Sequence, residues 1–162
     1  MTVAPAPRRS AEEQARLDAA LVDLFQRRIT FNQTLGLQVV SVLAPEPRVR
    51  FEMRPGFVGH YQYGRLHGGV ISATLDVVGS LALMVALGEK HADENTDQVL
   101  HRFARMGTID LRVDYLRPGL GESFEASAEV TRLGARIGST QMRLVNDQGN
   151  LIATAAAAYT VS

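Results

Sequence analysis

The segment that decides the fold is residues 66–87, LHGGVISATLDVVGSLALMVAL, which is apolar along almost its whole length. It opens on His67, Gly68 and Gly69, and it carries a single carboxylate, Asp76. A helix that is apolar nearly all round must be buried on most of its sides. Because a buried and unpaired carboxylate is costly, we expect Asp76 to be paired, neutralised or used in chemistry.

The composition of this segment argues against a membrane span. Crossing a bilayer takes ~20 predominantly apolar residues, and His67, two glycines and Asp76 occupy part of this run. The N-terminal stretch MTVAPAPRRSAEE lacks the apolar region of a secretory signal, and the chain contains no cysteine. We therefore expect a cytoplasmic protein with no membrane span, no disulfide framework and no thiolate zinc site.

Length and charge limit the organisation and the partners of the chain. A chain of 162 residues with 46% hydrophobic residues is typical of one domain with an ordinary core. Seventeen basic and seventeen acidic residues give a formal net charge of zero, which argues against nucleic acid as the main partner. We predict a flexible N-terminal tail over residues 1–9 and a single domain over residues 10–162.

Hydrophobic periodicity predicts the elements around the central segment. Ser10 and Glu13 form an S-x-x-E capping box, and the leucines that follow predict an N-terminal helix. Short helices are predicted at 30–36 and 99–106, and a long loop at 55–65. Alternating apolar residues predict strands at 37–43, 48–54, 108–118, 122–134, 135–146 and 150–161. The predicted fold class is α+β, with an antiparallel sheet wrapped around a long central helix.

Two of these strand predictions specify which side chains face the helix. In the strand at 108–118, the alternation predicts a buried face formed by Ile109, Leu111, Val113 and Tyr115. In the last strand, the alanine run at 155–158 is predicted to place small residues against the helix.

Small residues surround Asp76 on the predicted helix. The positions one or two turns away are Gly69, Ser72, Ala73, Gly79 and Ser80. This pattern indicates that the acid lies beside open space, as in the wall of a cavity. The structural alternative is that Asp76 accepts hydrogen bonds from Ser72, Ser80 or an arginine of a neighbouring strand.

The glycines at the start of the helix provide a second candidate feature. First-turn N–H groups lack partners within the helix, and together with the helix dipole they can polarise a carbonyl and stabilise an oxyanion. The alternative is a plain loop-to-helix turn. Gly68 and Asp76 are eight residues apart, or about 12 Å along a helix. If both act on one substrate they come from two chains, which predicts a homodimer with two equivalent shared sites.

These motifs resemble those of a known family. LHGG with an aspartate nine residues after the histidine, together with GTIDLRVDYLRPG at 107–119, resembles the hotdog-fold acyl-CoA thioesterases of the PaaI type. Residues 20–161 are particularly similar to the YigI-type medium/long-chain acyl-CoA thioesterases. The resemblance implies a hotdog fold, dimers that often pair into tetramers, and hydrolysis of an acyl-CoA thioester without a cofactor.

The resemblance also implies roles for individual residues. Asp76 would be the nucleophile or the general base, Gly68 the oxyanion donor, and His67 the residue that shapes the helix entrance. Gly69 and Ser80 would lie beside the substrate. Many relatives carry an asparagine six residues before the histidine; this position is Tyr61 here, and the neighbouring His60 is a candidate substitute.

The phosphates of CoA need cationic or N–H partners. The stretch TRLGARIGS at 131–139 carries Arg132 and Arg136 among glycines, and it is either a phosphate-binding loop or a solvated hairpin. The four histidines show no metal-site spacing, so no metal is expected. The alternative function is a non-catalytic acyl-CoA-binding module of the same fold, which would keep the glycine-rich entrance without needing Asp76.

Overall fold

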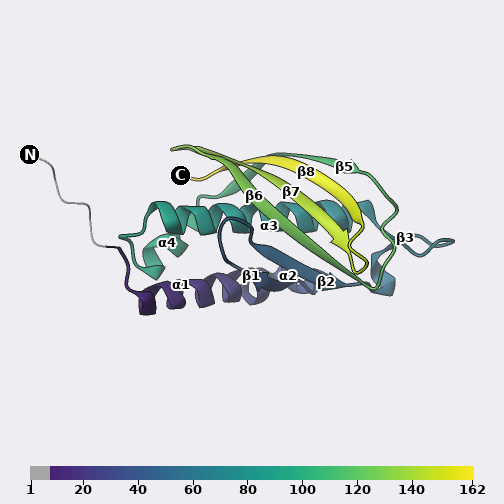
Figure 1. The fold of residues 1–162 in the computed structure, drawn as a ribbon, viewed down its shortest axis with the longest axis horizontal. Helices are drawn as coiled ribbons and strands as arrows, with labels where there is room; N and C mark the ends of the chain where they lie inside the picture. The colour runs from purple at the N-terminus through teal and green to yellow at the C-terminus, as the bar shows by residue number, and fades with distance from the viewer. Residues whose placement is uncertain (1–7) are drawn as a thin grey trace, which may run out of the picture.

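The computed structural model describes residues 8–162, whose elements follow one another as labelled in Figure 1. The helical elements are α1 (Ala11–Asp23), a π-helical turn η1 (Leu24–Arg28), α2 (Thr30–Leu35), a 3₁₀ turn η2 (Pro55–Phe57), α3 (Gly68–Lys90) and α4 (Thr96–Phe103). The strands are β1 (Gln38–Ser41), β2 (Arg48–Glu52), β3 (Val58–His60), β4 (Arg65–Leu66), β5 (Gly107–Tyr115), β6 (Ser123–Leu133), β7 (Ile137–Asn146) and β8 (Leu151–Thr160).

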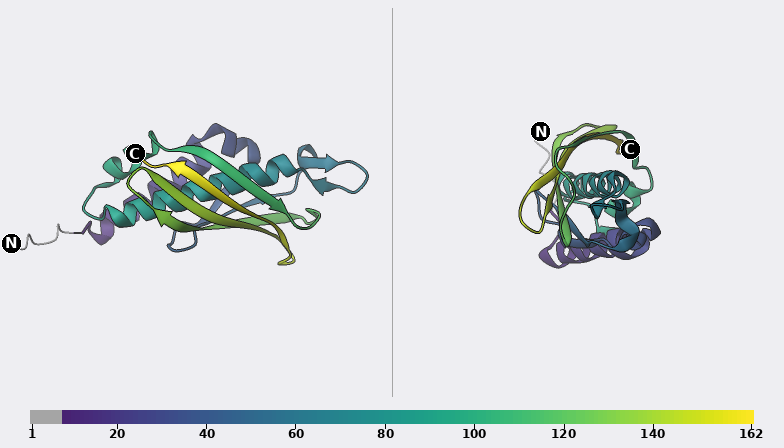
Figure 2. Two further views of the ribbon diagram at one scale, coloured as in Figure 1. Left: turned by 90° about the horizontal axis from the view of Figure 1, so that it is seen from above. Right: turned by 90° about the vertical axis from the view of Figure 1, so that its right-hand side faces the viewer.

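Within the described residues, six strands form one antiparallel sheet in the order β1-β2-β6-β7-β8-β5. The end-on view in Figure 2 shows the sheet curling over α3, with α1 on the opposite side of the helix. The predicted fold class, a sheet wrapped around a long central helix with an N-terminal helix, is confirmed.

The core lies between α3 and the concave face of the sheet. The buried side of α3 presents large apolar residues: Ile71, Leu75, Val78, Leu81, Leu83, Met84 and Leu87. Opposite them, Ala153, Ala155 and Ala157 are buried on alternate positions of β8. The alanine run is therefore a strand, as predicted, and its small side chains let the helix approach the sheet closely. Each fully buried leucine contributes about 1.5–3 kcal/mol of hydrophobic stabilisation.

The burial of α3 also explains its composition. Gly68–Lys90 is long and apolar enough to cross a membrane by length and composition. The structure buries most of its apolar stretch inside the domain, which is the position of a core helix.

The N-terminal helix follows its predicted pattern with one difference. The stripe Leu17, Leu21 and Phe25 is buried, and the Ser10 hydroxyl accepts the Glu13 N–H at 3.1 Å. The Glu13 carboxylate does not complete the capping box, because it accepts the Thr96 N–H at 2.7 Å and joins α1 to α4.

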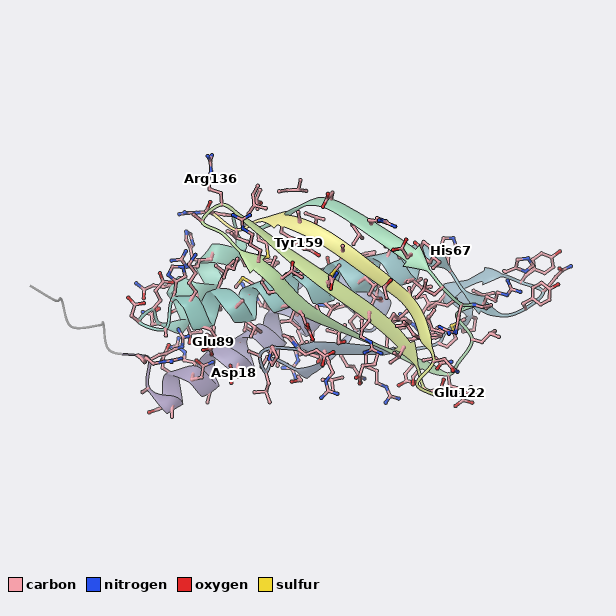
Figure 3. The ribbon with its side chains drawn as sticks, turned by 45° about the horizontal axis from the view of Figure 1, so that its top comes forward. Asp18, His67, Glu89, Glu122, Arg136 and Tyr159 are labelled. Carbon is pink, nitrogen blue, oxygen red and sulfur yellow. The ribbon has the colours of Figure 1, made fainter. Side chains whose placement is uncertain are left out.

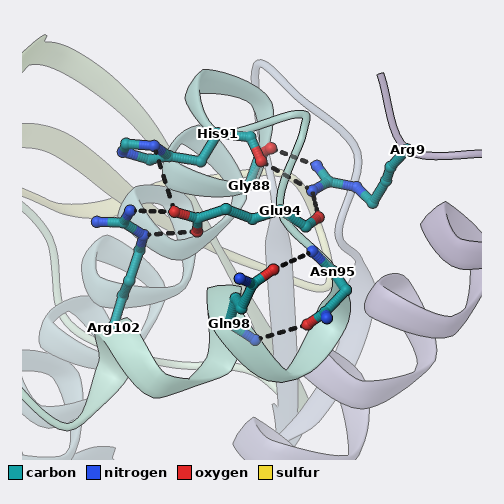
Figure 4. Close-up of polar contacts among 7 residues, drawn as sticks. All are labelled: Arg9, Gly88, His91, Glu94, Asn95, Gln98 and Arg102. Atoms are coloured by element: carbon teal, nitrogen blue, oxygen red, sulfur yellow. Dashed lines mark hydrogen bonds and ion pairs between the residues drawn. The ribbon is translucent and has the colours of Figure 1, made fainter. Parts of the chain in front are cut away.

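The C-terminal end of α3 is held by Arg9, as Figure 4 shows. Residues 1–7 of the predicted tail lie outside the described residues. Arg9 donates to the carbonyl oxygens of Gly88, His91 and Glu94, three groups at or just beyond the helix end. The Glu94 carboxylate pairs with Arg102 of α4, and these hydrogen bonds lower the pKa of Glu94. The chain is thus anchored from Arg9 onward.

The edge strand β5 departs from the predicted alternation. Ile109, predicted to be buried, is 52% exposed. Thr108 pairs with Tyr159 and Asp110 with Ala158, so Ile109 is an extra residue that forms a β-bulge. A bulge reverses which residues face each side of a strand. The prediction for Ile109 is therefore wrong, and Thr108 lies on the helix-facing side in its place. Tyr115, also predicted to be buried, is 55% exposed at the open edge of the sheet.

The predicted long loop at 55–65 is also more ordered than expected. Residues 55–57 form η2, and β3 and β4 pair as an antiparallel hairpin. Figures 1 and 2 show this hairpin projecting past the N-terminal end of α3. Pro55 and Gly56 lie in η2, Gly64 lies at the hairpin turn and Gly59 lies within β3, and this density of glycine and proline is why the sequence pattern alone favoured a loop.

Candidate active site

The start of α3 leaves one N–H group without a partner. His67 is the N-cap, and its Nδ1 accepts the Gly69 N–H at 2.8 Å. The Gly69 N–H is therefore occupied, whereas the Gly68 N–H makes no hydrogen bond to any residue that the structure describes. Because Nδ1 accepts, the neutral imidazole carries its proton on Nε2. His67 thus caps the start of the helix, and the Gly68 N–H remains available to a ligand oxygen.

Close packing around this entrance explains why positions 59 and 68 are glycines. A Cβ at Gly68 would lie 3.2 Å from Cε1 of Tyr115, whose hydroxyl donates to the Gly68 carbonyl at 3.1 Å. A Cβ at Gly59 of β3 would lie 2.7 Å from Cα of His67. The entrance is therefore held between the hairpin and the end of β5, with the Tyr115 ring forming one wall.

Asp76 lies partly exposed on α3, and its carboxylate has a partner from the sheet. The Thr108 hydroxyl of β5 donates to Oδ1 of Asp76 at 2.9 Å. The serines that the sequence suggested as partners donate elsewhere: Ser72 and Ser80 bond main-chain carbonyls of their own helix at 3.1 and 2.8 Å. Sequence reasoning missed Thr108 because the alternation of β5, read without the bulge, turned it away from the helix.

A buried tyrosine holds the same turn of α3 from behind. Tyr159 of β8 is fully buried, and its hydroxyl donates to the main-chain carbonyl of Asp76 at 3.1 Å. Burial raises the pKa of the Tyr159 phenol and the Asp76 charge raises it further, so the hydroxyl stays protonated. A Cβ at Gly79 would overlap this hydroxyl. The space that the sequence predicted to be open beside Asp76 is therefore occupied, at Gly79, by the Tyr159 side chain.

The rest of the small-residue side of α3 is not fully covered by any residue that the structure describes. It consists of residues that are not fully buried and that recur every three or four positions: Gly69, Ser72, Ala73, Asp76, Val77 and Ser80. Beside it runs β5, the last strand in the sheet order, which exposes Ile109, Tyr115 and Leu116. A stripe of small residues next to a long unpaired strand edge that exposes apolar side chains is a typical protein–protein contact surface.

The remaining predicted residues lie at two separate places. His60 and Tyr61 are in the projecting hairpin, where Tyr61 is 86% exposed and its ring stacks on His60 with centroids 6.0 Å apart. Arg132 and Arg136 are exposed around the β6–β7 turn. This turn lies by the far end of α3, where Lys90 Nζ donates to the Gly134 carbonyl at 3.4 Å.

The two arginines are distant from the glycine entrance of the same chain. Lys90 is 22 residues beyond Gly68, or about 33 Å along the helix, and Figure 3 places Arg136 and His67 towards opposite ends of the molecule. Among residues 8–162, no group of three or more His, Asp or Glu side chains could hold a metal ion.

Comparison with known proteins agrees with this architecture. The model of the thioesterase superfamily matches residues 63–153, more than half of the chain. Two relatives, from Escherichia coli strain K12 and Salmonella typhimurium, carry the name medium/long-chain acyl-CoA thioesterase YigI. Each is 37% identical to this chain over 139 residues, which is 86% of this chain and 90% of the relative.

A solved structure supports the same assignment. The crystal structure of a Shewanella oneidensis protein related to the thioesterase superfamily superposes with a TM-score of 0.87 and 34% identity. The match covers 94% of this chain and 100% of that one. Together with the central helix, its glycine entrance and the sheet around it, these matches show that the chain belongs to the thioesterase superfamily.

Proposed function

We propose that this protein is a homodimeric acyl-CoA thioesterase that hydrolyses medium- and long-chain fatty acyl-CoA to free fatty acid and CoA. The observation that carries the proposal is the pairing on one helix of a free Gly68 N–H with a partly exposed Asp76 carboxylate. The substrate class rests on the two YigI relatives, whose names specify medium- and long-chain acyl-CoA.

The proposed chemistry assigns one task to each group. The thioester carbonyl accepts the Gly68 N–H, and the positive end of the helix dipole stabilises the oxyanion that develops there. Asp76 takes a proton from a water molecule that attacks the carbonyl carbon, or attacks that carbon itself. In the first route the tetrahedral intermediate expels the CoA thiolate, which receives the proton from Asp76, and the fatty acid is released. In the second route expulsion of the thiolate leaves a mixed anhydride on Asp76, which a water molecule then hydrolyses to the fatty acid while its proton passes to the thiolate. Thr108 holds one carboxylate oxygen, Oδ1, so Oδ2 remains to face the water or the substrate.

The proposed dimer follows from the spacing of the two groups. Gly68 and Asp76 lie about 12 Å apart on one rigid helix, too far to act on a single carbonyl. Two antiparallel α3 helices across a two-fold axis would bring Asp76 of each protomer to the glycine entrance of the other. The uncovered stripe of α3 and the free edge of β5 supply the surface that such a dimer needs, and a dimer of dimers is a further step of assembly.

The substrate would extend away from this centre in both directions. On one side, Ser80 lies one turn beyond Asp76 on the same helix. On the other side, the hairpin with His60 and Tyr61 directly precedes the Gly68 entrance, so it would cover the site that this entrance forms with Asp76 of the second chain. Arg132 and Arg136 are the candidate partners for the CoA phosphates. The reaction needs no cofactor, since CoA is part of the substrate, and we expect it to take place in the cytoplasm.

Release of CoA from acyl-CoA of several chain lengths tests the proposal. We expect Asp76→Asn to lower kcat by at least about 100-fold, since a general base contributes about 10²–10⁴-fold, while gel filtration still shows the dimer. Unchanged turnover in this variant would overturn the role of Asp76. Tight acyl-CoA binding by the native protein without any turnover would instead identify a binding module.

Subunit mixing tests the shared site directly. Asp76→Asn and Gly68→Pro each disable both sites of their own homodimer. In a mixed dimer, one site combines two intact halves, so random exchange of equal amounts should restore about a quarter of the native activity. If each site were built within one chain, mixing would restore nothing.

A further inference from the structure

One cross-strand pair of residues forms hydrogen bonds to both the side chain and the main chain of Asp76. Thr108 and Tyr159 lie directly opposite each other on β5 and β8. Thr108 donates to the side-chain carboxylate of Asp76 at 2.9 Å, and Tyr159 donates to its main-chain carbonyl at 3.1 Å. Opposite residues of an antiparallel pair project from the same face of the sheet, so the two donors reach α3 together.

This arrangement depends on the bulge in β5. Tyr159 faces the helix together with the buried alanines of β8, which pair with Leu111 and Val113 on β5. If Ile109 took a regular place in the ladder, alternation from Leu111 would turn Thr108 toward the outer face. The bulge therefore decides whether Asp76 has a hydroxyl partner.

The Asp110 side chain closes the bulge. Its Oδ1 accepts the main-chain N–H of Ala158 at 2.9 Å. An extra residue disrupts the ladder locally, and here a carboxylate supplies the acceptor for the β8 N–H. On the other side of the bulge, the Thr160 hydroxyl donates to the carbonyls of Arg105 and Gly107 at 3.1 and 3.3 Å. The bulge is thus pinned to β8 on both sides.

We propose that Asp110 is a positioning residue for the hydrolysis: its carboxylate holds the β5 bulge that turns the Thr108 hydroxyl toward Asp76. This inference rests on the proposed function, because it concerns the geometry of the proposed base or nucleophile. Asp110 acts through a hydrogen bond that it accepts, and its charge is not required. An asparagine, whose amide oxygen also accepts, should therefore replace it.

The test compares Asp110→Ala and Asp110→Asn with Asp114→Ala as the matched control. Asp114 is an acid on the same strand whose carboxylate contacts Arg112 and not β8. Displacement of a reacting group by about 1 Å costs up to about 100-fold in rate. We expect Asp110→Ala to lower kcat about 10- to 100-fold with KM unchanged, and Asp110→Asn to keep most of the activity. Asp114→Ala should behave like the native protein.

A double-mutant cycle separates positioning from general loss of structure. If Asp110 acts through Thr108, Asp110→Ala should have little further effect on kcat in a Thr108→Val background. Additive losses, native kcat in Asp110→Ala, or an Asp110→Asn variant as impaired as the alanine variant would each refute the inference. Should Asp110→Ala prove insoluble, Asp110→Ser, whose shorter side chain withdraws the acceptor, replaces it in the same cycle. Failure of the proposed function is a different outcome, in which the native protein binds acyl-CoA but releases no CoA from it.

Discussion

Replacing Gly68 by proline would remove the candidate oxyanion donor while leaving the helix start in place. Position 68 is the first residue of α3, where proline is favoured because its missing N–H has no helical partner. His67 has φ −67° and ψ 135°, the conformation that a residue before proline prefers. The cap from His67 to the Gly69 N–H does not involve the altered atom. The substitution therefore deletes one hydrogen-bond donor with little change to the backbone.

The size of the effect follows from what that donor contributes. Removing a single oxyanion-hole donor typically lowers kcat by about 10²–10³-fold, or about 2.7–4 kcal/mol. Proline also adds a Cβ, which would lie 3.2 Å from the Tyr115 ring. Gly68→Ala adds the same atom but keeps the N–H, so it is the matched control. Because Tyr115 is 55% exposed, its ring can move by a few tenths of an ångström to accommodate the methyl group.

The assay is CoA release at saturating acyl-CoA, with thermal melting and gel filtration of each variant. We expect Gly68→Ala to stay within about tenfold of the native kcat, and Gly68→Pro to fall about 100-fold below Gly68→Ala. Both variants should remain dimeric. If the two variants turned over at the same rate, the N–H of Gly68 would have no part in stabilising the oxyanion, and another donor would have to be sought.

Three further predictions concern stability. Gly79→Ala should destabilise the fold by about 1–3 kcal/mol in urea titrations, because its methyl group meets the Tyr159 hydroxyl, and adding Tyr159→Phe should recover part of the loss. His67→Ala should lose about 0.5–2 kcal/mol of helix capping, which His67→Asn should restore; equal stability of the two would contradict the role of the cap. Arg102 lowers the pKa of Glu94 below its ordinary 4.5, so this pair stabilises the fold above that pH and stops doing so as the pH falls through the depressed pKa. The difference in melting temperature between native protein and Glu94→Gln should therefore vanish in acid.

Local patterns were sufficient for most of the architecture. The continuous apolar run located the central helix, and periodicity located the N-terminal helix and the long strands, since each of these buries one regular face. The departures arise where tertiary contacts decide the outcome. The bulge at Ile109 depends on an acceptor that Asp110 offers to a strand almost fifty residues away, and no local alternation reveals it. The sequence pattern also predicted more open space beside Asp76 than the structure has, because Tyr159 of the last strand packs against Gly79.

Placing Gly68 and Asp76 on one continuous helix has a consequence for the dimer as a whole. In the proposed assembly, the distance between the two reaction centres equals the distance between these residues along α3, about 12 Å. Because both groups are part of one continuous helix, movements of the loops do not change this distance. Two thioesters bound that close would lie side by side in the proposed dimer, so we expect occupation of one centre to affect binding at the other.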